Sequence, residues 1–464
     1  MTERTPTRVV IVGGGFGGVY TALELQRRLR RDRGVQVTIV SRDNFLLFTP
    51  MLHEVAASDL DVTHIVNPVR KLLPRVQFFD GDVARIDLAR RAVVVAHGAD
   101  AHTHDLPYDH LVIALGSVTN FFGLPGLEER ALTMKSLGDA IMLRNRMIAL
   151  LEEADTECGA AERERLLTFV VAGAGFAGVE TAAAVNDFVH EALRFYPNLS
   201  PQMIRTVLVH PADVILPELS ASLGRYAQRK LEARGMAVRA RTKVTAVDAT
   251  TVTLDDGTTL PASTVIWTAG TTPNPLVATL PCATERGRIC VTACLEVNGW
   301  PGVWALGDCA LVPDGTTGRF HPPTAQHAIR EGRCVARNIV AAIRGGAKRP
   351  FAFRTIGQLA SLGRRTGVAQ ILGVNFSGFV AWWLWRTIYL AKLPRFEKKL
   401  RVALDWTLDL MFSKDLVKFQ TATGMTISRA DAARDTPAAI TPSSTASSFD
   451  EPRLVPLPRA AARG

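Results

Sequence analysis

Two runs of apolar residues lead directly into glycine-rich turns and set the pattern of the first half of the chain. Residues 9–18 read VVIVGGGFGG and residues 169–178 read FVVAGAGFAG. Such unbroken apolar runs predict strands that are buried on both faces, as in parallel sheets. The first turn predicts a helix from Gly15 to about Leu29, and the second turn opens a corresponding helix. A strand–turn–helix unit therefore occurs twice.

Three later apolar runs extend this pattern. Residues 111–117 read LVIALGS and residues 265–270 read VIWTAG. Each of these two runs follows a β-rich stretch and predicts a buried strand that closes one of the two units. Residues 303–309, VWALGDC, predict another buried strand, and a helix is expected to follow over residues 324–343.

This order of elements predicts an α/β fold with two Rossmann-like dinucleotide-binding domains and a C-terminal amphipathic region. From residue 424 onward the chain is rich in Ser, Thr, Ala and Pro and is expected to be disordered. The expected boundaries are 1–128 and 269–348 for the two parts of the first domain, 129–268 for the second domain, 349–423 for the C-terminal region, and 424–464 for the disordered tail.

Composition narrows the class of partners. The chain has 464 residues, of which 47% are hydrophobic, and a formal net charge of +10. A basic surface favours dinucleotides, acidic lipids or nucleic acid. Nucleic acid is not expected, because the basic residues are dispersed except near the C-terminus and no nucleic-acid-binding motif is present. The six cysteines contain no Cys-x-x-Cys pair and the N-terminus shows no secretory signal, so we expect reduced thiols in a cytosolic environment.

Each glycine-rich turn has the spacing G-x-G-x-x-G of a dinucleotide-binding fingerprint. The first glycine permits the tight turn, the second lets backbone N–H groups approach a pyrophosphate, and the third lets the helix pack on the strand. One copy alone is a weak signal, whereas two copies in the same context are typical of a flavoprotein that exchanges electrons with a nicotinamide. The six glycines are Gly13, Gly15, Gly18, Gly173, Gly175 and Gly178.

With its other motifs, the chain resembles the type II NADH:quinone oxidoreductases, which are single-subunit peripheral flavoenzymes. The resemblance covers about residues 8–420, and the combination of FTPML with AQHA is its most specific part. It implies FAD as cofactor and NADH as substrate, with two electrons passed to a membrane quinone without proton pumping and without a metal. The longest motifs are NFLLFTPMLHEVAAS at 44–58, GAGFAGVETAAAVNDF at 173–188 and PPTAQHAIREG at 322–332.

The resemblance implies that the first fingerprint holds FAD. Asp308 should accept hydrogen bonds from the ribityl hydroxyls or from the flavin side of the pyrophosphate, and a helix N-cap is the alternative role. Ser41 stands where an acid usually grips the adenosine ribose, and it can bind that ribose only weakly. The residues expected to bind FAD are Gly13, Gly15, Gly18, Ser41, Thr49, Pro50, Gly116, Asp308 and Ala325.

The second fingerprint is implied to hold NADH. His210 occupies the place where a Glu would hydrogen-bond the 2′-hydroxyl of the adenosine ribose and repel a 2′-phosphate. A neutral His does neither strongly, and Arg239 and Arg241 follow in the same domain, so the use of NADPH stays open. The residues expected to bind NADH are Gly173, Gly175, Gly178, Glu180, His210 and Gly270.

Glu180 and Gln326 are implied to take part in the chemistry. In the family an acid at the place of Glu180 lies near the nicotinamide and the flavin, where it orients the carboxamide or relays a proton. A Glu that merely stabilises the helix dipole is the alternative. Gln326 should face the flavin and hydrogen-bond a quinone carbonyl. Arg330 replaces the second Gln that the family often carries, which leaves the quinone specificity open.

A membrane is a further expected partner, because a hydrophobic quinone dissolves in lipid. Residues 376–393 are apolar and aromatic, but Arg386 and Lys392 leave them short of the ~20 apolar residues of a span. Residues 395–419 predict an amphipathic helix. We therefore expect a membrane-associating region that lies on anionic lipid at the cytoplasmic face of the cell membrane, with a homodimer contact or a single span as alternatives. The apolar face of the helix consists of Leu400, Leu404, Leu408 and Met411.

Other functions of the same fold make different demands on the sequence. A thiol or disulfide reductase needs a Cys pair beside the flavin, and residues 41–58 contain none. A sulfide:quinone oxidoreductase needs cysteines that reach the flavin, and the spacing of Cys158 and Cys334 does not resemble that family closely. A quinone reductase that prefers NADPH is a further alternative. The intact glycines and the AQHA motif argue against a redox sensor without turnover.

Overall fold

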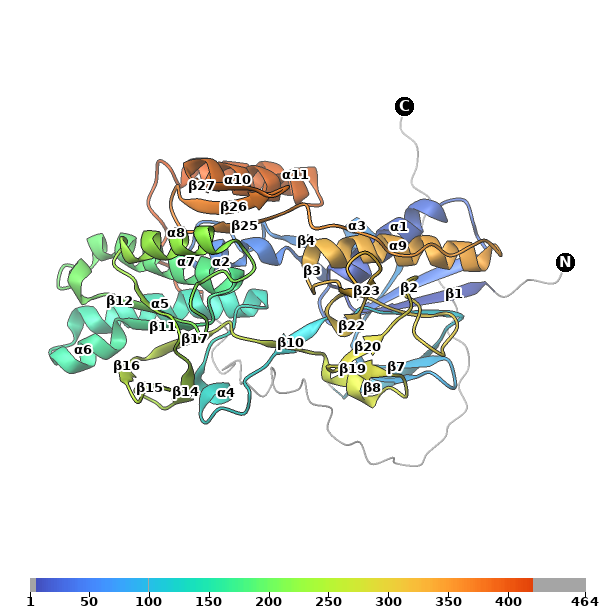
Figure 1. The fold of residues 1–464 in the computed structure, drawn as a ribbon, viewed down its shortest axis with the longest axis horizontal. Coiled ribbons are helices and arrows are strands. Elements are labelled where there is room, and N and C mark those ends of the chain that lie inside the picture. The colour runs from blue at the N-terminus through green and yellow to red at the C-terminus, as the bar shows by residue number, and fades with distance from the viewer. Residues whose placement is uncertain (1–5, 99, 420–464) are drawn as a thin grey trace. The chain divides into compact units, whose positions relative to one another are not determined.

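A computed structural model describes residues 6–98 and 100–419 of the chain (Figure 1). Its first large sheet has the strand order β21-β9-β1-β2-β5, and every neighbouring pair is parallel. The predicted strands near residues 9, 111 and 303 are therefore confirmed and lie in one sheet. The disordered tail expected from residue 424 lies outside the described residues. The five strands are β1 (Thr7–Val12), β2 (Val35–Ser41), β5 (Gln77–Asp80), β9 (His110–Ile113) and β21 (Val303–Ala305).

A second parallel sheet has the order β13-β12-β11-β17. Its first strand in the chain, β11, leads into the second glycine turn, as β1 leads into the first. The prediction of an α/β fold with two Rossmann-like halves is confirmed. The four strands are β11 (Thr168–Ala172), β12 (Arg205–Val209), β13 (Ala237–Arg239) and β17 (Thr264–Trp267), and α5 (Leu137–Thr156), α6 (Ala160–Leu166), α7 (Phe176–Ala192) and α8 (Ala221–Glu232) belong to this half.

Each parallel sheet is accompanied by a three-stranded antiparallel sheet that precedes its closing strand. The β-rich stretches predicted before β9 and β17 form these sheets. A short antiparallel pair, β10 with β18, joins the two halves of the chain. The strands are β6 (Asp82–Asp87), β7 (Ala92–His97), β8 (His102–Pro107), β14 (Val244–Val247), β15 (Thr251–Leu254), β16 (Thr259–Pro261), β10 (Ser117–Thr119) and β18 (Thr271–Pro273).

Two helices, α1 (Phe16–Arg28) and α9 (Ala325–Ile343), pack against each other on the first sheet, and both match the predicted helices. The remaining elements are short connections. They are β3 (Phe45–Leu47), α2 (Leu52–Ala56), β4 (Val66–Pro68), α3 (Val69–Leu72), α4 (Leu127–Arg130), β19 (Thr284–Glu285), β20 (Arg288–Cys290), β22 (Ala310–Leu311), β23 (Pro313–Asp314) and β24 (Arg319–Phe320).

The C-terminal region forms a small antiparallel sheet followed by two helices (Figure 1). The helix predicted over residues 395–419 is too long, because α11 ends at Leu408. Turn hydrogen bonds continue to Phe412, and beyond them the side chain of Lys414 donates to the carbonyl oxygen of Ala57 (2.9 Å). The elements are β25 (Gly357–Ser361), β26 (Gly367–Ile371), β27 (Val374–Gly378), α10 (Phe379–Lys392) and α11 (Phe396–Leu408).

These helices share one hydrophobic core with the second nucleotide-binding half. Trp385 of α10 and Val402 of α11 are fully buried in the same cluster as Met51 and Phe188. A separate core lies around the first sheet. Within residues 6–98 and 100–419, no helix has both the length and the apolar character that a membrane span requires. The fold thus brings α2, α7, α10 and α11 together, and this is where the candidate site forms.

Candidate active site

The first glycine turn has the geometry that a bound pyrophosphate requires. Gly13 has φ +110°, and a Cβ there would collide with the carbonyl oxygen of Ala114. A Cβ on Gly18 would collide with the carbonyl oxygen of Gly13, so the helix lies directly on the turn. Gly15 behaves differently, because a Cβ there would meet no atom within 4 Å. The turn is therefore closed toward the protein and open where a dinucleotide would approach, which fits FAD.

The second turn repeats this geometry. Gly173 has φ +102°, and Gly178 packs directly on its carbonyl oxygen. Glu218, which the sequence did not single out, lies beside Gly175. A Cβ on Gly175 would be 3.1 Å from Oε1 of Glu218. Burial raises the pKa of Glu218 above its ordinary value.

Asp308 lies in a polar group at the junction of the two halves. Ser117 donates a hydrogen bond to its Oδ2 (2.7 Å), and the ammonium of Lys135 donates to the hydroxyl of Ser117 (2.9 Å). Burial lowers the pKa of Lys135, and Asp308 and Asp139 oppose this shift. The sequence did not single out Ser117 or Lys135. Ser117 ends the LVIALGS motif, whereas no local pattern marks Lys135. At the end of β2, Ser41 accepts from the backbone N–H of its own loop and lies against the first turn.

Ala325 and Gln326 form the first turn of α9, and both are partly buried. Glu331, on the next turns, accepts a hydrogen bond from the backbone N–H of Gly307 (2.8 Å) and so ties α9 to the residue before Asp308. Burial raises the pKa of Glu331 to about 7. The start of α9 is therefore fixed relative to the polar group around Asp308.

Glu180, on α7, is buried beneath the C-terminal region. Its Oε1 accepts hydrogen bonds from the backbone N–H of Ser361 (3.0 Å) and from the indole N–H of Trp385 (2.9 Å). Its Oε2 lies 3.8 Å from Nδ1 of His53. Burial raises the pKa of Glu180 to about 8; the two hydrogen bonds oppose this shift and the nearby Glu54 reinforces it. The carboxyl is therefore mainly protonated near neutral pH and can release a proton.

His53 and Glu54 are buried residues of α2 that sequence reasoning did not single out. They directly follow the FTPML motif, which is the signal that pointed toward them. Glu54 accepts a hydrogen bond from the indole of Trp406 (3.0 Å), and burial raises its pKa to about 8. Burial lowers the pKa of His53 to about 4, so this ring is neutral. Two protonated carboxyls and a neutral imidazole therefore lie together in an apolar setting.

A row of aromatic rings connects the first glycine turn with Glu180. The ring centroids are 5.9 Å apart from Phe16 to Phe48, 6.2 Å from Phe48 to Tyr389, and 4.9 Å from Tyr389 to Trp385. Thr49 and Pro50 follow Phe48 in a 3₁₀ turn. The fold thus brings the FTPML motif, the start of α1, the helix α10 and Glu180 into one contiguous group.

His210 directly follows β12 and is buried. The backbone N–H of Ala174, inside the second turn, donates to its Nδ1 (3.2 Å). Burial lowers the pKa of His210. Gly116 and Gly270 both adopt positive φ after the strands that close the two halves.

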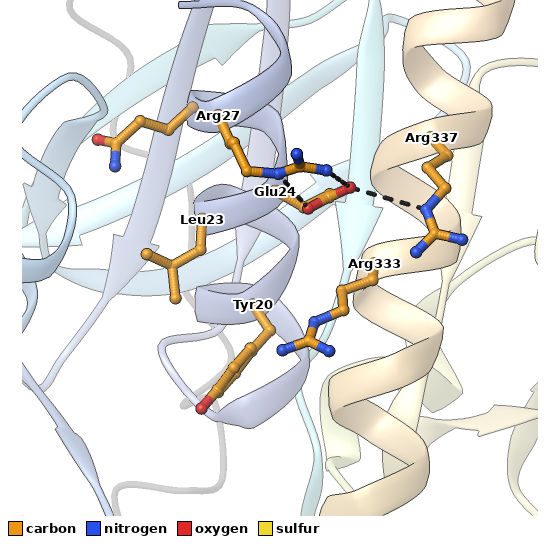
Figure 2. A pocket seen from close by; sticks show the side chains of 7 residues that line it. Tyr20, Leu23, Glu24, Arg27, Arg333 and Arg337 are labelled. Carbon is orange, nitrogen blue, oxygen red and sulfur yellow. Dashed lines mark hydrogen bonds and ion pairs between the residues drawn. The ribbon is translucent and has the colours of Figure 1, made fainter. Parts of the chain in front are cut away.

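A surface cleft of about 570 Å³ lies between α1 and α9 and contains none of the predicted site residues (Figure 2). Glu24 accepts hydrogen bonds from Arg27 (2.7 Å) and Arg28 (2.6 Å) and pairs with Arg337 of α9 at 3.7 Å. Although burial opposes the shift, Arg27 and Arg28 hold the pKa of Glu24 below its ordinary value. The group joins the two helices. The cleft is lined by Tyr20, Leu23, Glu24, Gln26, Arg27, Arg333 and Arg337.

Two family profiles match the chain. The pyridine nucleotide-disulphide oxidoreductase family matches residues 7–332, and the NDH2 C-terminal domain matches residues 356–415. The chain belongs to the pyridine nucleotide-disulphide oxidoreductase family.

Individual relatives narrow this class. The type II NADH:quinone oxidoreductase Ndh of Mycobacterium tuberculosis is 33% identical over 88% of this chain and 89% of the relative. The demethylphylloquinone reductase NdbB of Synechocystis sp. is 34% identical over 88% of this chain and 96% of the relative. The chain therefore belongs to the type II NADH:quinone oxidoreductases. NDH2 from Plasmodium falciparum, solved in complex with NADH, shares the fold with a TM-score of 0.83 at 19% identity, over 89% of this chain and 100% of that chain.

Proposed function

We propose that this chain oxidises NADH with bound FAD and passes two electrons to a quinone without proton pumping. The observation that carries the proposal is the family match across both the nucleotide-binding halves and the C-terminal domain. Bound FAD supplies the hydride acceptor and the two-electron donor. The protein supplies binding, orientation and protons.

Specific residues fit these roles. The first glycine turn fits the FAD pyrophosphate, with Gly15 on its open side, and the second turn fits the pyrophosphate of NADH. Asp308 offers carboxylate oxygens to hydroxyl groups, while Ser117 fixes its orientation. Gln326, on the first turn of α9, presents an amide to a quinone carbonyl. Glu180 holds a proton close to the reacting groups and releases it as the quinone is reduced.

We further propose that an apolar stripe on α11 rests on an anionic membrane at the cytoplasmic face. Val402 and Trp406 face the core, and two polar side chains also turn toward the protein: Lys398 donates to the carbonyl oxygen of Thr63 (2.6 Å), and Asp405 forms a hydrogen bond with His64. The leucines at 400, 404 and 408 face outward, so α11 carries apolar side chains on its exposed side as well. Such a surface suits lipid or a second copy of the chain. We define the α11 stripe as Leu400, Leu404 and Leu408 of α11 together with Met411 of the turn that follows, which are 63%, 55%, 43% and 74% exposed.

The proposed reaction can be tested by anaerobic stopped-flow spectroscopy of the purified holoenzyme. Addition of NADH should bleach the yellow flavin absorbance, and subsequent addition of menadione should restore it. A protein that is colourless after reconstitution with FAD, or a bleached flavin that menadione does not reoxidise, would contradict the proposal.

A further inference from the structure

His210 lies at the adenosine-ribose end of the second nucleotide-binding half, and we propose that it allows the enzyme to use NADPH as well as NADH. This inference rests on the proposed function and specifies its reductant. In this fold the residue after the second strand faces the 2′-position of the ribose, and an acid there binds a hydroxyl and repels a phosphate. Here a histidine stands at that place.

The surroundings of His210 fix which of its nitrogens is available. The N–H of Ala174 donates to Nδ1 at 3.2 Å, so Nδ1 is an acceptor and the proton of the neutral ring lies on Nε2. Nε2 is buried and has no hydrogen-bond partner among the described residues. Leaving a buried donor unpaired is unfavourable, and oxygens of a 2′-hydroxyl or a 2′-phosphate can both satisfy it. Neither ligand is rejected.

Two basic residues, Arg239 and Arg241, lie close to the backbone of His210. Its backbone N–H donates to the carbonyl oxygen of Arg239 (2.9 Å), at the end of β13, and Arg241 follows two residues later. Both residues are exposed. Arg241 pairs with Asp213 at 3.6 Å, but both side chains are about four-fifths exposed, so the pair is weak and can open toward a phosphate.

The acids around this end of the domain do not replace the missing carboxylate. Asp213 faces Arg241, and Asp256 is an exposed residue that interacts with Arg239. Glu218 lies beside Gly175, at the pyrophosphate end of the site rather than the ribose end. None of these three carboxylates occupies the position directly after β12, from which an acid rejects a 2′-phosphate; that position is His210.

The test compares the two reductants and two probes of the adenosine end. We expect kcat/KM for NADPH to lie within about twentyfold of that for NADH, with menadione as acceptor. Isothermal titration of the holoenzyme should show 2′,5′-ADP binding within about tenfold of 5′-ADP. The His210→Glu variant should lower the ratio of kcat/KM for NADPH to that for NADH by at least about tenfold, and it should weaken binding of 2′,5′-ADP relative to 5′-ADP by a similar factor.

The matched control is His102→Glu, the same change at an exposed histidine of β8, and it should keep both reductants within about threefold of the wild type. A wild-type preference for NADH above twentyfold, or a His210→Glu enzyme that accepts NADPH as well as the wild type does, overturns the inference. The ratio of kcat/KM for NADPH to that for NADH is measured on the wild-type enzyme, so the inference can be tested even if a variant misfolds. If neither nucleotide reduces the flavin, the proposed function fails, and the 2′,5′-ADP titration still decides the inference.

Discussion

At the scale of single residues, the candidate site depends on carboxyls that burial keeps protonated. Glu180 and Glu54 both have their pKa raised to about 8, and each accepts a hydrogen bond from a tryptophan indole. An acid with such a pKa is matched to proton release near neutral pH. The ring of His53, on α2, is neutral, so it adds no positive charge that would lower the pKa of either carboxyl.

Replacing Glu180 with glutamine should separate the two halves of the reaction. The amide oxygen of Glu180→Gln can still accept from Ser361 and Trp385, but the side chain can no longer release a proton. We expect reoxidation of reduced flavin by menadione to slow about 10- to 100-fold, whereas bleaching by NADH changes less than about threefold. Stopped-flow traces measure both phases in one enzyme, so the first phase serves as the internal control. Equal slowing of the two phases would instead indicate a structural role.

The same two carboxyls should make stability depend on pH. Because their pKa is raised on folding, the folded state binds protons more tightly than the unfolded state between about pH 4.5 and 8. Their contribution is complete below this window and is lost as the pH rises through it. Each group therefore adds a slope of up to about 1.4 kcal/mol per pH unit.

Urea unfolding of Glu54→Gln across this pH window should show a flatter decline than the wild type does. A glutamine at exposed Glu128 is the control and should leave the slope unchanged. If the wild type and Glu54→Gln show the same slope, Glu54 does not retain its proton in the folded state.

At the scale of elements, the contact between α1 and α9 depends on Gly332. A Cβ at this position would lie 2.6 Å from the carbonyl oxygen of Gly17 and 2.8 Å from the hydroxyl of Thr21. We therefore expect Gly332→Ala to lower the free energy of unfolding by about 1–3 kcal/mol and to reduce flavin retention, because α1 starts at the glycine turn that we propose holds FAD. Urea denaturation measures the change in the free energy of unfolding, and the flavin absorbance of the purified protein measures flavin retention.

The matched control for that change is Gly138→Ala in α5. There a Cβ would meet its nearest atom, the hydroxyl of Ser136, at an ordinary 3.6 Å. The alanine should be neutral or stabilise by up to about 1 kcal/mol, because it favours the helix. Similar destabilisation by both substitutions would show that the α1–α9 contact has no special sensitivity.

Local patterns predicted most elements because their causes are local. The apolar runs of β1, β9, β11 and β17 must be buried on both faces, and the glycine turns start α1 and α7. The end of α11 was not predictable in this way. Its apolar spacing continues to Met411, but the helix ends at Leu408, and Lys414 then contacts the segment around Ala57. Those contacts join residues that are far apart in the chain.

At the scale of the whole molecule, the candidate site depends on contacts that no motif contains. The sequence indicated Glu180 and Asp308 singly, and their proposed roles remain predictions. It did not indicate that Trp385 of the C-terminal region donates to Glu180, or that Lys135 reaches Asp308 through Ser117. Such partners become visible only when the fold brings distant segments together.

The outward-facing leucines of α11 lead to the last prediction. Replacing Leu400, Leu404 and Met411 together with serine removes apolar surface that the fold leaves exposed, so folding and the turnover of water-soluble menadione should change little. Binding to phosphatidylcholine vesicles that contain phosphatidylglycerol should weaken about 30- to 100-fold in a sedimentation assay, since each side chain contributes about 1 kcal/mol. Serine at Phe195, exposed on another part of the chain, is the control and should bind as the wild type does. Unchanged vesicle binding, with a wild-type dimer that becomes a monomer in the triple variant, would identify the α11 stripe as a subunit contact.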